Sequence, residues 1–170
     1  MARTLKPVYD YVTPSCADAP AQLFMAPIIR MQIVRESQAA AAVQIRSPQQ
    51  AWADCLRGRF ANCDREVMVS IILNTKNRVL AIDPVFQGNL NASIVTMREL
   101  FKSALLLGAA AIIAAHNHPS GDATPSPEDV LITREMIAAG RLLDIELLDH
   151  LVLGAESFVS MRERGLGFSR

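Results

Sequence analysis

An apolar run at residues 109–115 leads directly into a polar turn and then into an amphipathic segment that starts at Pro127. A short apolar run without polar interruption is typical of a strand that is buried on both faces of a sheet. Ser126 is a preferred residue just before a helix, and proline suits the first helical position. The stretch therefore predicts a central strand, a sharp turn and a helix over residues 127–143.

Four residues in this stretch follow the spacing H-x-H-x7-S-x2-D: His116, His118, Ser126 and Asp129. Side chains two apart on a strand point the same way, so both imidazoles can reach one ion. The small and turn-forming residues between them and the helix let the chain fold back, which returns Asp129 toward the histidines. Two imidazoles and one carboxylate form an open three-ligand site, the arrangement of catalytic zinc. The sequence predicts Zn²⁺ at His116, His118 and Asp129.

A plainer interpretation treats the same residues as structural. Ser126 would then only cap the helix, and Asp129 would only favour the helix dipole. This interpretation leaves two of the three histidines in the chain without a role. We therefore prefer the metal site.

Elsewhere, short β-branched runs predict strands and capping patterns predict helices. Ser47 with Gln50 and Thr96 with Glu99 both match capping boxes. The expected strands are 66–74, 79–87, 109–115, 145–153 and 158–160, and the expected helices are 47–57, 96–107 and 127–143. One side of the helix at 96–107 is expected to be buried through its apolar residues Leu100, Phe101, Ala104, Leu105 and Leu107. This alternation predicts an α/β fold with a mixed sheet sandwiched by helices.

The first 44 residues have a different composition from the rest of the chain. Four of the nine prolines fall within residues 1–27, without a periodic apolar pattern between them. We expect an irregular proline-rich arm over residues 1–44, with one candidate strand at 28–34, and a folded domain over residues 45–170.

Charge and cysteine content limit the classes of function. The formal net charge is zero, so no overall basic field attracts a phosphate backbone, although five cations lie close together in the sequence. These cations are Arg57, Arg59, Arg65, Lys76 and Arg78. Three cysteines without a C-x2-C pair indicate a reduced chain, and no apolar run reaches the length of a membrane helix. We expect a cytoplasmic protein that does not contact a membrane.

The segments HNHPSGDATPSPED and LLDHLVLG resemble those of the bacterial RadC-like proteins, a branch of the JAMM (MPN+) metalloprotease superfamily. The resemblance runs from about Ile45 to the C-terminus and includes Glu66, Gly88, Arg98-Glu99 and Asp149-His150. It implies a JAMM/MPN-like (cytidine-deaminase-like) fold and zinc-dependent hydrolysis of a peptide or isopeptide bond. RadC-like proteins usually have His-Pro where this chain has Thr96-Met97. That departure changes a helix start near the site but touches no metal ligand.

The resemblance also implies residue roles. Glu66 matches the superfamily's upstream glutamate, which implies a general base, although the residues alone would suggest an exposed strand start. Ser126 would donate a hydrogen bond to the oxyanion that forms during hydrolysis. His150 lies inside an apolar strand, and we expect a buried polar residue satisfied by Asp149, or a residue that orients a ligand, rather than a ligand itself.

Two other functions are also compatible with the sequence. RadC-like proteins carry a DNA-repair label, and a metal-activated water can attack a phosphodiester, so DNA processing is one alternative. The other is a metal-binding interaction module without catalysis. A peptide or protein substrate is the expected partner, and the sequence does not indicate the oligomeric state.

Overall fold

The computed structural model describes residues 43–60, 63–88 and 96–168. Within these ranges five strands form one mixed sheet in the order β2-β1-β3-β4-β5. The strands are β1 (Glu66–Leu73), β2 (Val79–Gly88), β3 (Ala111–Asn117), β4 (Glu146–Leu153) and β5 (Phe158–Ser160). The helical elements are α1 (Pro48–Ala51), a π-helical turn η2 (Trp52–Leu56), α2 (Met97–Leu106) and α3 (Pro127–Leu142).

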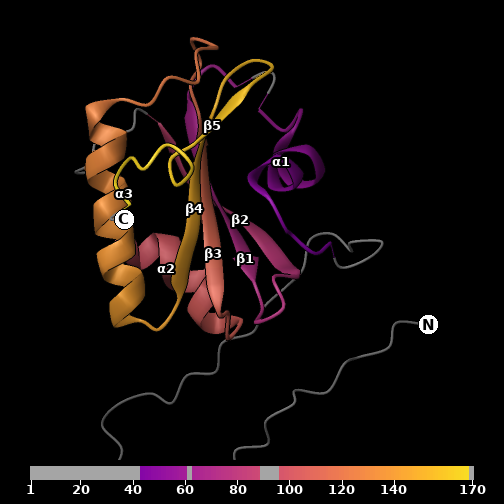
Figure 1. Cartoon of the computed structure of the whole chain (residues 1–170), viewed down its shortest axis with the longest axis vertical. Helices are drawn as coiled ribbons and strands as arrows, with labels where there is room; N and C mark the ends of the chain where they lie inside the picture. The colour runs from indigo at the N-terminus through magenta and orange to yellow at the C-terminus, as the bar shows by residue number, and fades with distance from the viewer. Residues whose placement is uncertain (1–42, 61–62, 89–95, 169–170) are drawn as a thin grey trace, which may run out of the picture. The chain divides into compact units, whose positions relative to one another are not determined.

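The sheet is antiparallel except at its centre. β1 pairs antiparallel with both β2 and β3, and β4 pairs antiparallel with β5, whereas β3 and β4 run parallel. The parallel pair needs a crossover, and α3 provides it. β3 therefore lies between β1 and β4, and its carboxyl end delivers the two histidines beside the start of α3 (Figure 1).

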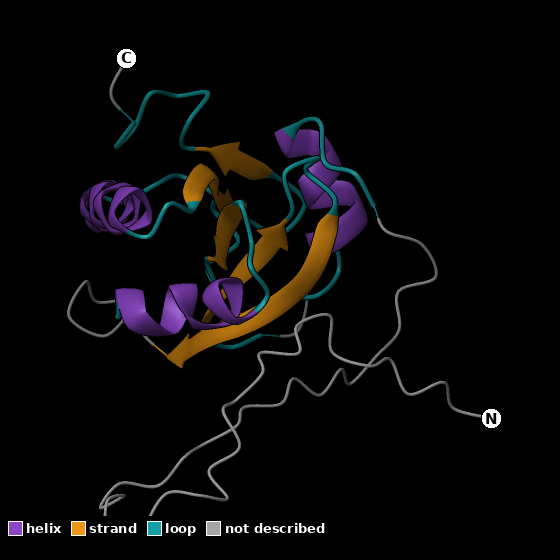
Figure 2. Cartoon of the chain, turned by 90° about the horizontal axis from the view of Figure 1, so that it is seen from below, coloured by secondary structure: helices purple, strands orange, loops and turns teal. Residues whose placement is uncertain are grey.

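Helices cover both faces of the sheet. Figure 2 shows α2 and α3 on one face and α1 on the other. Alternate residues of the strands point to opposite faces, so Ile113 packs toward α1 and η2 while Ile112 packs toward α2 and α3. All residues of β3 are buried, as expected for a central strand. The predicted mixed sheet between helices is confirmed.

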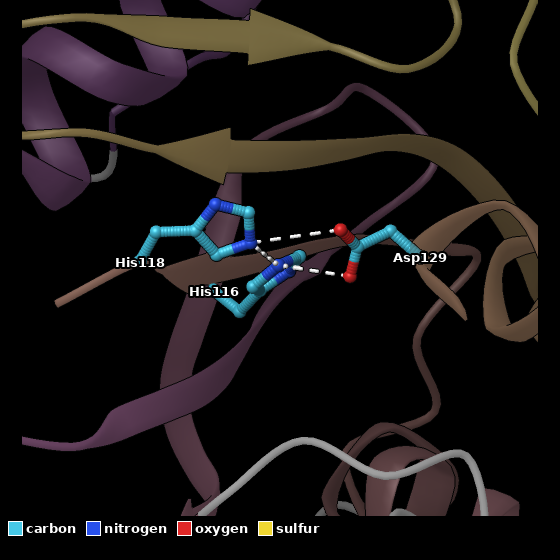
Figure 3. Close-up of side chains that lie close together, drawn as sticks. All are labelled: His116, His118 and Asp129. Atoms are coloured by element: carbon cyan, nitrogen blue, oxygen red, sulfur yellow. Dashed lines mark hydrogen bonds and ion pairs between the residues drawn. The ribbon is translucent and has the colours of Figure 1, made fainter. Parts of the chain in front are cut away.

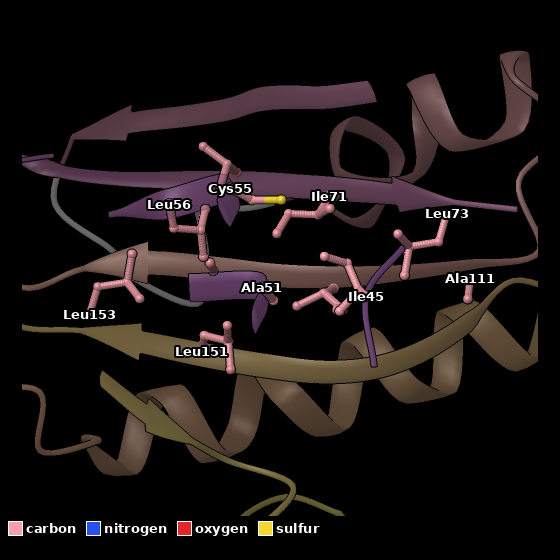
Figure 4. Packing of buried hydrophobic residues seen from close by; sticks show 12 residues of the cluster. Ile45, Ala51, Cys55, Leu56, Ile71, Leu73, Ala111, Leu151 and Leu153 are labelled. Carbon is pink, nitrogen blue, oxygen red and sulfur yellow. The ribbon is translucent and has the colours of Figure 1, made fainter. Parts of the chain in front are cut away.

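Two separate apolar clusters make up the core. The cluster under α1 and η2 appears in Figure 4 and joins the odd-numbered positions of the central strands to the first helical segment. The second cluster, under α2 and α3, contains Phe101 and Met136, both fully buried. Trp52 closes one edge of the first cluster by stacking on Phe158 at 5.5 Å between ring centroids.

Several local expectations need correction. The capping box at Thr96 does not form, because Glu99 pairs with Lys102 and the Thr96 side chain makes no capping bond. Leu105 is 52% exposed, although the helical pattern suggested burial. It lies roughly 140° around the helix from Leu100, which is fully buried, so the two cannot face the same core.

Other expectations fall partly or wholly outside the described residues. The candidate strand at 28–34 lies there, as does nearly all of the predicted arm. The boundary between arm and domain therefore stays a prediction. No helix in the described ranges is both long enough and apolar enough to cross a membrane.

Candidate metal centre

The strand-turn-helix at the centre of the fold positions the predicted ligands. β3 ends at Asn117, and the next residue, His118, is tied to β4 by a bond from its backbone N–H to the Leu153 carbonyl. The turn then uses Gly121 at a positive φ of 81°, a conformation that glycine adopts without strain. Ser126 caps α3 as predicted, in a capping box with Asp129. The turn thus brings the first turn of the helix back over the end of the strand.

Three side chains converge there, as Figure 3 shows. One ligand atom from each of His116, His118 and Asp129 lies within 4.8 Å of the other two. The two Nε2 atoms are 3.1 Å apart, and Asp129 Oδ1 lies 3.1 Å from His116 Nε2. Asp129 Oδ2 lies 3.5 Å from His118 Nε2. His116 and Asp129 are buried, while the His118 side chain is 15% exposed, so the cluster opens toward solvent on the His118 side.

The turn fixes the orientation of the His118 ring. Its Nδ1 lies 2.8 Å from the carbonyl oxygen of Asp122. A carbonyl only accepts hydrogen bonds, so Nδ1 carries the proton in this contact and Nε2 presents a lone pair. This is the arrangement in which histidine ligates a metal, with the second ring nitrogen held by a neighbouring group.

Asp129 is held as a carboxylate by its own helix start. Its Oδ2 accepts hydrogen bonds from the Ser126 backbone N–H at 2.7 Å and the Ser126 hydroxyl at 2.8 Å. Burial alone would raise the pKa of this carboxyl, but the hydrogen bond and charge of His116, together with the two bonds from Ser126, bring the pKa below its usual range. A carboxylate that stays ionised is the form that binds a cation.

His150 of β4 lies directly behind His116. The two rings contact through His116 Nδ1 and His150 Nε2 at 2.8 Å, and the other nitrogen of His150, Nδ1, lies 2.7 Å from the Thr133 hydroxyl. Burial, reinforced by the charge of His116, lowers the pKa of His150 to about 3, so this ring is neutral at pH 7. Both ring nitrogens of His150 thus contact protein groups, and the ring lies outside the cluster of His116, His118 and Asp129.

The expected pairing of the His150 ring with Asp149 is wrong. Adjacent residues of a strand point to opposite faces, so the two side chains diverge. Asp149 instead accepts bonds from the Ser160 hydroxyl and from backbone N–H groups, including that of His150. Burial raises the pKa of the Asp149 carboxyl in spite of these bonds.

Glu66 opens β1, next to the end of β3. Met68 pairs with His116 in the sheet register, and Glu66 lies two residues before Met68 on β1. Residues two apart on a strand share a face, so Glu66 lies on the same face as the histidines. Asn117 holds this strand start: its Oδ1 accepts from the Val67 N–H at 2.8 Å, and its amide donates to the Arg65 carbonyl.

Sequence reasoning missed two residues around this site, Asn117 and Thr133, and it missed the contact between the rings of His150 and His116. Asn117 was visible between the two histidines, and only the register showed that its side chain reaches β1. Thr133 lies one helical turn after Asp129, a spacing that puts both on one helix face. That spacing was the available signal.

The donor set fits a divalent transition metal such as Zn²⁺. Imidazole nitrogens and a carboxylate oxygen are its usual ligands, and three protein ligands leave a position open for water or substrate. The local geometry supports this assignment, because one ligand atom from each of the three side chains lies within reach of a single ion. Among the described residues, no other group of His, Cys, Asp or Glu side chains gathers in this way.

Comparisons with known proteins agree with this picture. A profile described as a RadC-like JAB domain matches residues 45–166. The UPF0758 protein of Roseiflexus castenholzii is 58% identical over 125 residues, which are 74% of this chain and 53% of the relative. The UPF0758 protein of Chloroflexus aggregans is 51% identical over 124 residues, and that of Moorella thermoacetica is 50% identical over 122. The chain spans about half the length of these relatives, and their names state no activity.

Proposed function

The chain belongs to the RadC-like JAB domain family, and from this premise we propose that it is a zinc-dependent hydrolase of peptide or isopeptide bonds. The five-stranded mixed sheet with helices on both faces agrees with a JAB/MPN-like fold. Family membership gives the fold and the residue pattern. The hydrolytic function is supported by the site itself.

The convergence of His116, His118 and Asp129 is the observation that carries this proposal. A metal that serves structure alone is normally enclosed by four protein ligands, whereas three ligands with a solvent-accessible side are typical of catalysis. When bound, such an ion acts as a Lewis acid that makes water acidic near neutral pH and polarises a carbonyl oxygen.

Glu66 supplies the general base in this proposal. It lies two residues before Met68, which pairs with His116, and so on the same face of the sheet as that histidine. From there its carboxylate would take a proton from the attacking water and pass it to the leaving amine. Asn117 holds the start of β1, which keeps Glu66 in place relative to the ligands.

Ser126 has a hydroxyl that can serve the reaction without releasing Asp129. The hydroxyl donates to Asp129 Oδ2, but the Ser126 backbone N–H donates to the same oxygen. The hydroxyl can therefore turn toward a developing oxyanion while the carboxylate keeps one of its two bonds. Removing such a donor typically lowers kcat by a factor of about 10²–10³.

The proposal is tested with Glu66→Gln in zinc-loaded protein. The amide keeps the size of the side chain but cannot accept the proton, so we expect zinc to remain bound while hydrolysis falls by about 10²–10⁴-fold. The assay uses a fluorogenic peptide mixture together with peptides that contain an isopeptide bond to a lysine side chain.

Glu146→Gln is the matched control, because Glu146 also opens a strand but at the opposite end of the sheet. We expect this control to cleave like the wild type. Equal turnover in Glu66→Gln would contradict the assigned base. Salt-sensitive binding and cleavage of DNA, with no cleavage of any amide probe, would replace the proposal with a DNA-processing function.

A further inference from the structure

A buried chain of hydrogen bonds runs from α3 through β4 to the metal-binding face of β3. The Thr133 hydroxyl contacts His150 Nδ1 at 2.7 Å, and His150 Nε2 contacts His116 Nδ1 at 2.8 Å. The same hydroxyl lies 2.5 Å from the Asp129 carbonyl oxygen, one helical turn earlier. Thr133, His150 and His116 are each fully buried. In this chain of contacts, each group depends on its neighbour for a partner.

The hydroxyl has one hydrogen and two neighbours that can accept it, so this chain has two arrangements, of which only one keeps the bond from Thr133 to the Asp129 carbonyl. In the first, Thr133 donates to His150 Nδ1, and His150 donates from Nε2 to His116 Nδ1. His116 then carries its proton on Nε2, where it meets the Asp129 carboxylate at 3.1 Å. This arrangement blocks the nitrogen that a metal requires.

In the second arrangement, Thr133 donates to the Asp129 carbonyl and accepts from His150 Nδ1. The Nε2 of His150 then accepts from His116 Nδ1, and His116 Nε2 presents its lone pair to the ligand cluster. Both arrangements hold the same number of protons. Exchanging the first for the second moves the shared proton from His150 Nε2 to His116 Nδ1 and the Thr133 proton to His150 Nδ1. The proton on His116 Nε2 is released, and one proton is taken up at the Thr133 hydroxyl, so the total is unchanged.

We propose that Thr133 and His150 form a tautomer switch that sets which nitrogen of His116 is free, and that the switch thereby controls metal affinity. This inference rests on the metal binding in the proposed function, but not on hydrolysis. His118 needs no such device, because a carbonyl oxygen already fixes its ring. Both Thr133 and His150 are positioning residues that act through His116.

A hydroxyl is the side chain that suits this role. It can donate in one state and accept in the other, whereas a methyl group can do neither. With Thr133→Val, the second arrangement, which leaves His116 Nε2 free for the metal, would have the His150 Nδ1–H buried without an acceptor. The first arrangement would leave only the unprotonated His150 Nδ1 without a donor. Proteins tolerate a buried acceptor without a partner better than a buried N–H without one. The variant is therefore biased toward the tautomer that excludes the metal.

The test compares zinc affinity in wild type, Thr133→Val and Thr133→Ser by competition with a chromophoric chelator. We expect Thr133→Val to bind zinc about 10–100-fold more weakly, the range typical for residues that orient a metal ligand. Thr133→Ser, which keeps the hydroxyl, should bind within a few-fold of wild type. Thermal unfolding of the zinc-free variants checks that a loss of affinity is not a loss of fold.

A second pair of variants covers the case in which Thr133→Val does not fold. His150→Gln supplies an amide oxygen that accepts from His116 Nδ1–H, whereas His150→Phe supplies nothing. We expect near-normal zinc affinity in the first and a loss of at least tenfold in the second. Equal affinity in both would overturn the switch.

The ¹⁵N chemical shifts of the imidazoles give a direct readout. In wild type we expect His116 to carry its proton on Nε2 without zinc and on Nδ1 with zinc. A proton on Nδ1 in both states would overturn the switch. If wild type binds no zinc at all, the proposed function and the switch fail together. If Thr133→Val binds zinc as well as wild type does, only the switch fails.

Discussion

Lowering the pH from 7 to 5 should destabilise the metal-free protein through His150. Its pKa is about 3 in the folded chain and 6.5 when the ring is exposed, because burial disfavours the charged form. The unfolded state therefore binds more protons between these values, and stability falls as the pH drops below about 6.5. Above about pH 6.5 the contribution of the neutral His150 to stability is fully present. The loss continues until the pH approaches the folded value of about 3.

The expected loss of stability follows from the interval between pH 5 and the pKa of 6.5 in the unfolded chain. Each pH unit between the two pKa values changes the free energy of unfolding by about 1.4 kcal/mol, so pH 5 costs about 2 kcal/mol relative to pH 7. The assay is urea unfolding at both pH values with a chelator present. The glutamine of His150→Gln cannot titrate, so the stability that this variant loses between pH 7 and pH 5 should be smaller by about 2 kcal/mol. Asp129 does not interfere, since its ordinary pKa of 3.8 already lies below this window. The same pH dependence in wild type and His150→Gln would refute the reasoning.

Two further substitutions test the helix that carries Asp129. Ser126→Ala removes a helix cap and one of two bonds to the Asp129 carboxylate, so we expect a loss of about 1 kcal/mol in unfolding free energy and weaker zinc binding. An unchanged zinc affinity would show that the backbone bond alone holds the carboxylate. Gly140→Ala should destabilise the fold by about 1–3 kcal/mol, because the new Cβ would clash with the Ile145 carbonyl oxygen. Helix propensity alone predicts that alanine would stabilise the helix. The sign of the change in the free energy of unfolding, measured with denaturant, therefore decides between the two effects.

The sequence predicted the elements whose signals are local. The hydrophobic run before His116, the cap at Ser126 and the turn residues between them are all short-range patterns, and the structure contains the strand, turn and helix they predict. The three ligands could be chosen for the same reason. Their spacing encodes which side chains face one another once the strand and helix exist.

Contacts between distant segments could not be predicted in this way. His150 meets His116 because β3 and β4 pair in parallel with a register shift between Ile112 and Ile113, beyond which Ala114 lies beside His150. That register depends on packing of the whole sheet rather than on any local pattern. The pairing of Asn117 with the start of β1 has the same origin. The predicted burial of Leu105 is wrong for a simpler reason: the residue is apolar, but it lies roughly 140° around the helix from the buried Leu100.

The most direct test of the metal centre is the zinc content of the purified protein, measured by elemental analysis for wild type and for the double variant His116→Ala, His118→Ala. We expect about one zinc per chain in wild type and almost none in the double variant, with Glu146→Gln as a control that keeps its zinc. Wild type that stays free of metal after incubation with zinc at neutral pH, or a double variant that retains it, would contradict the account.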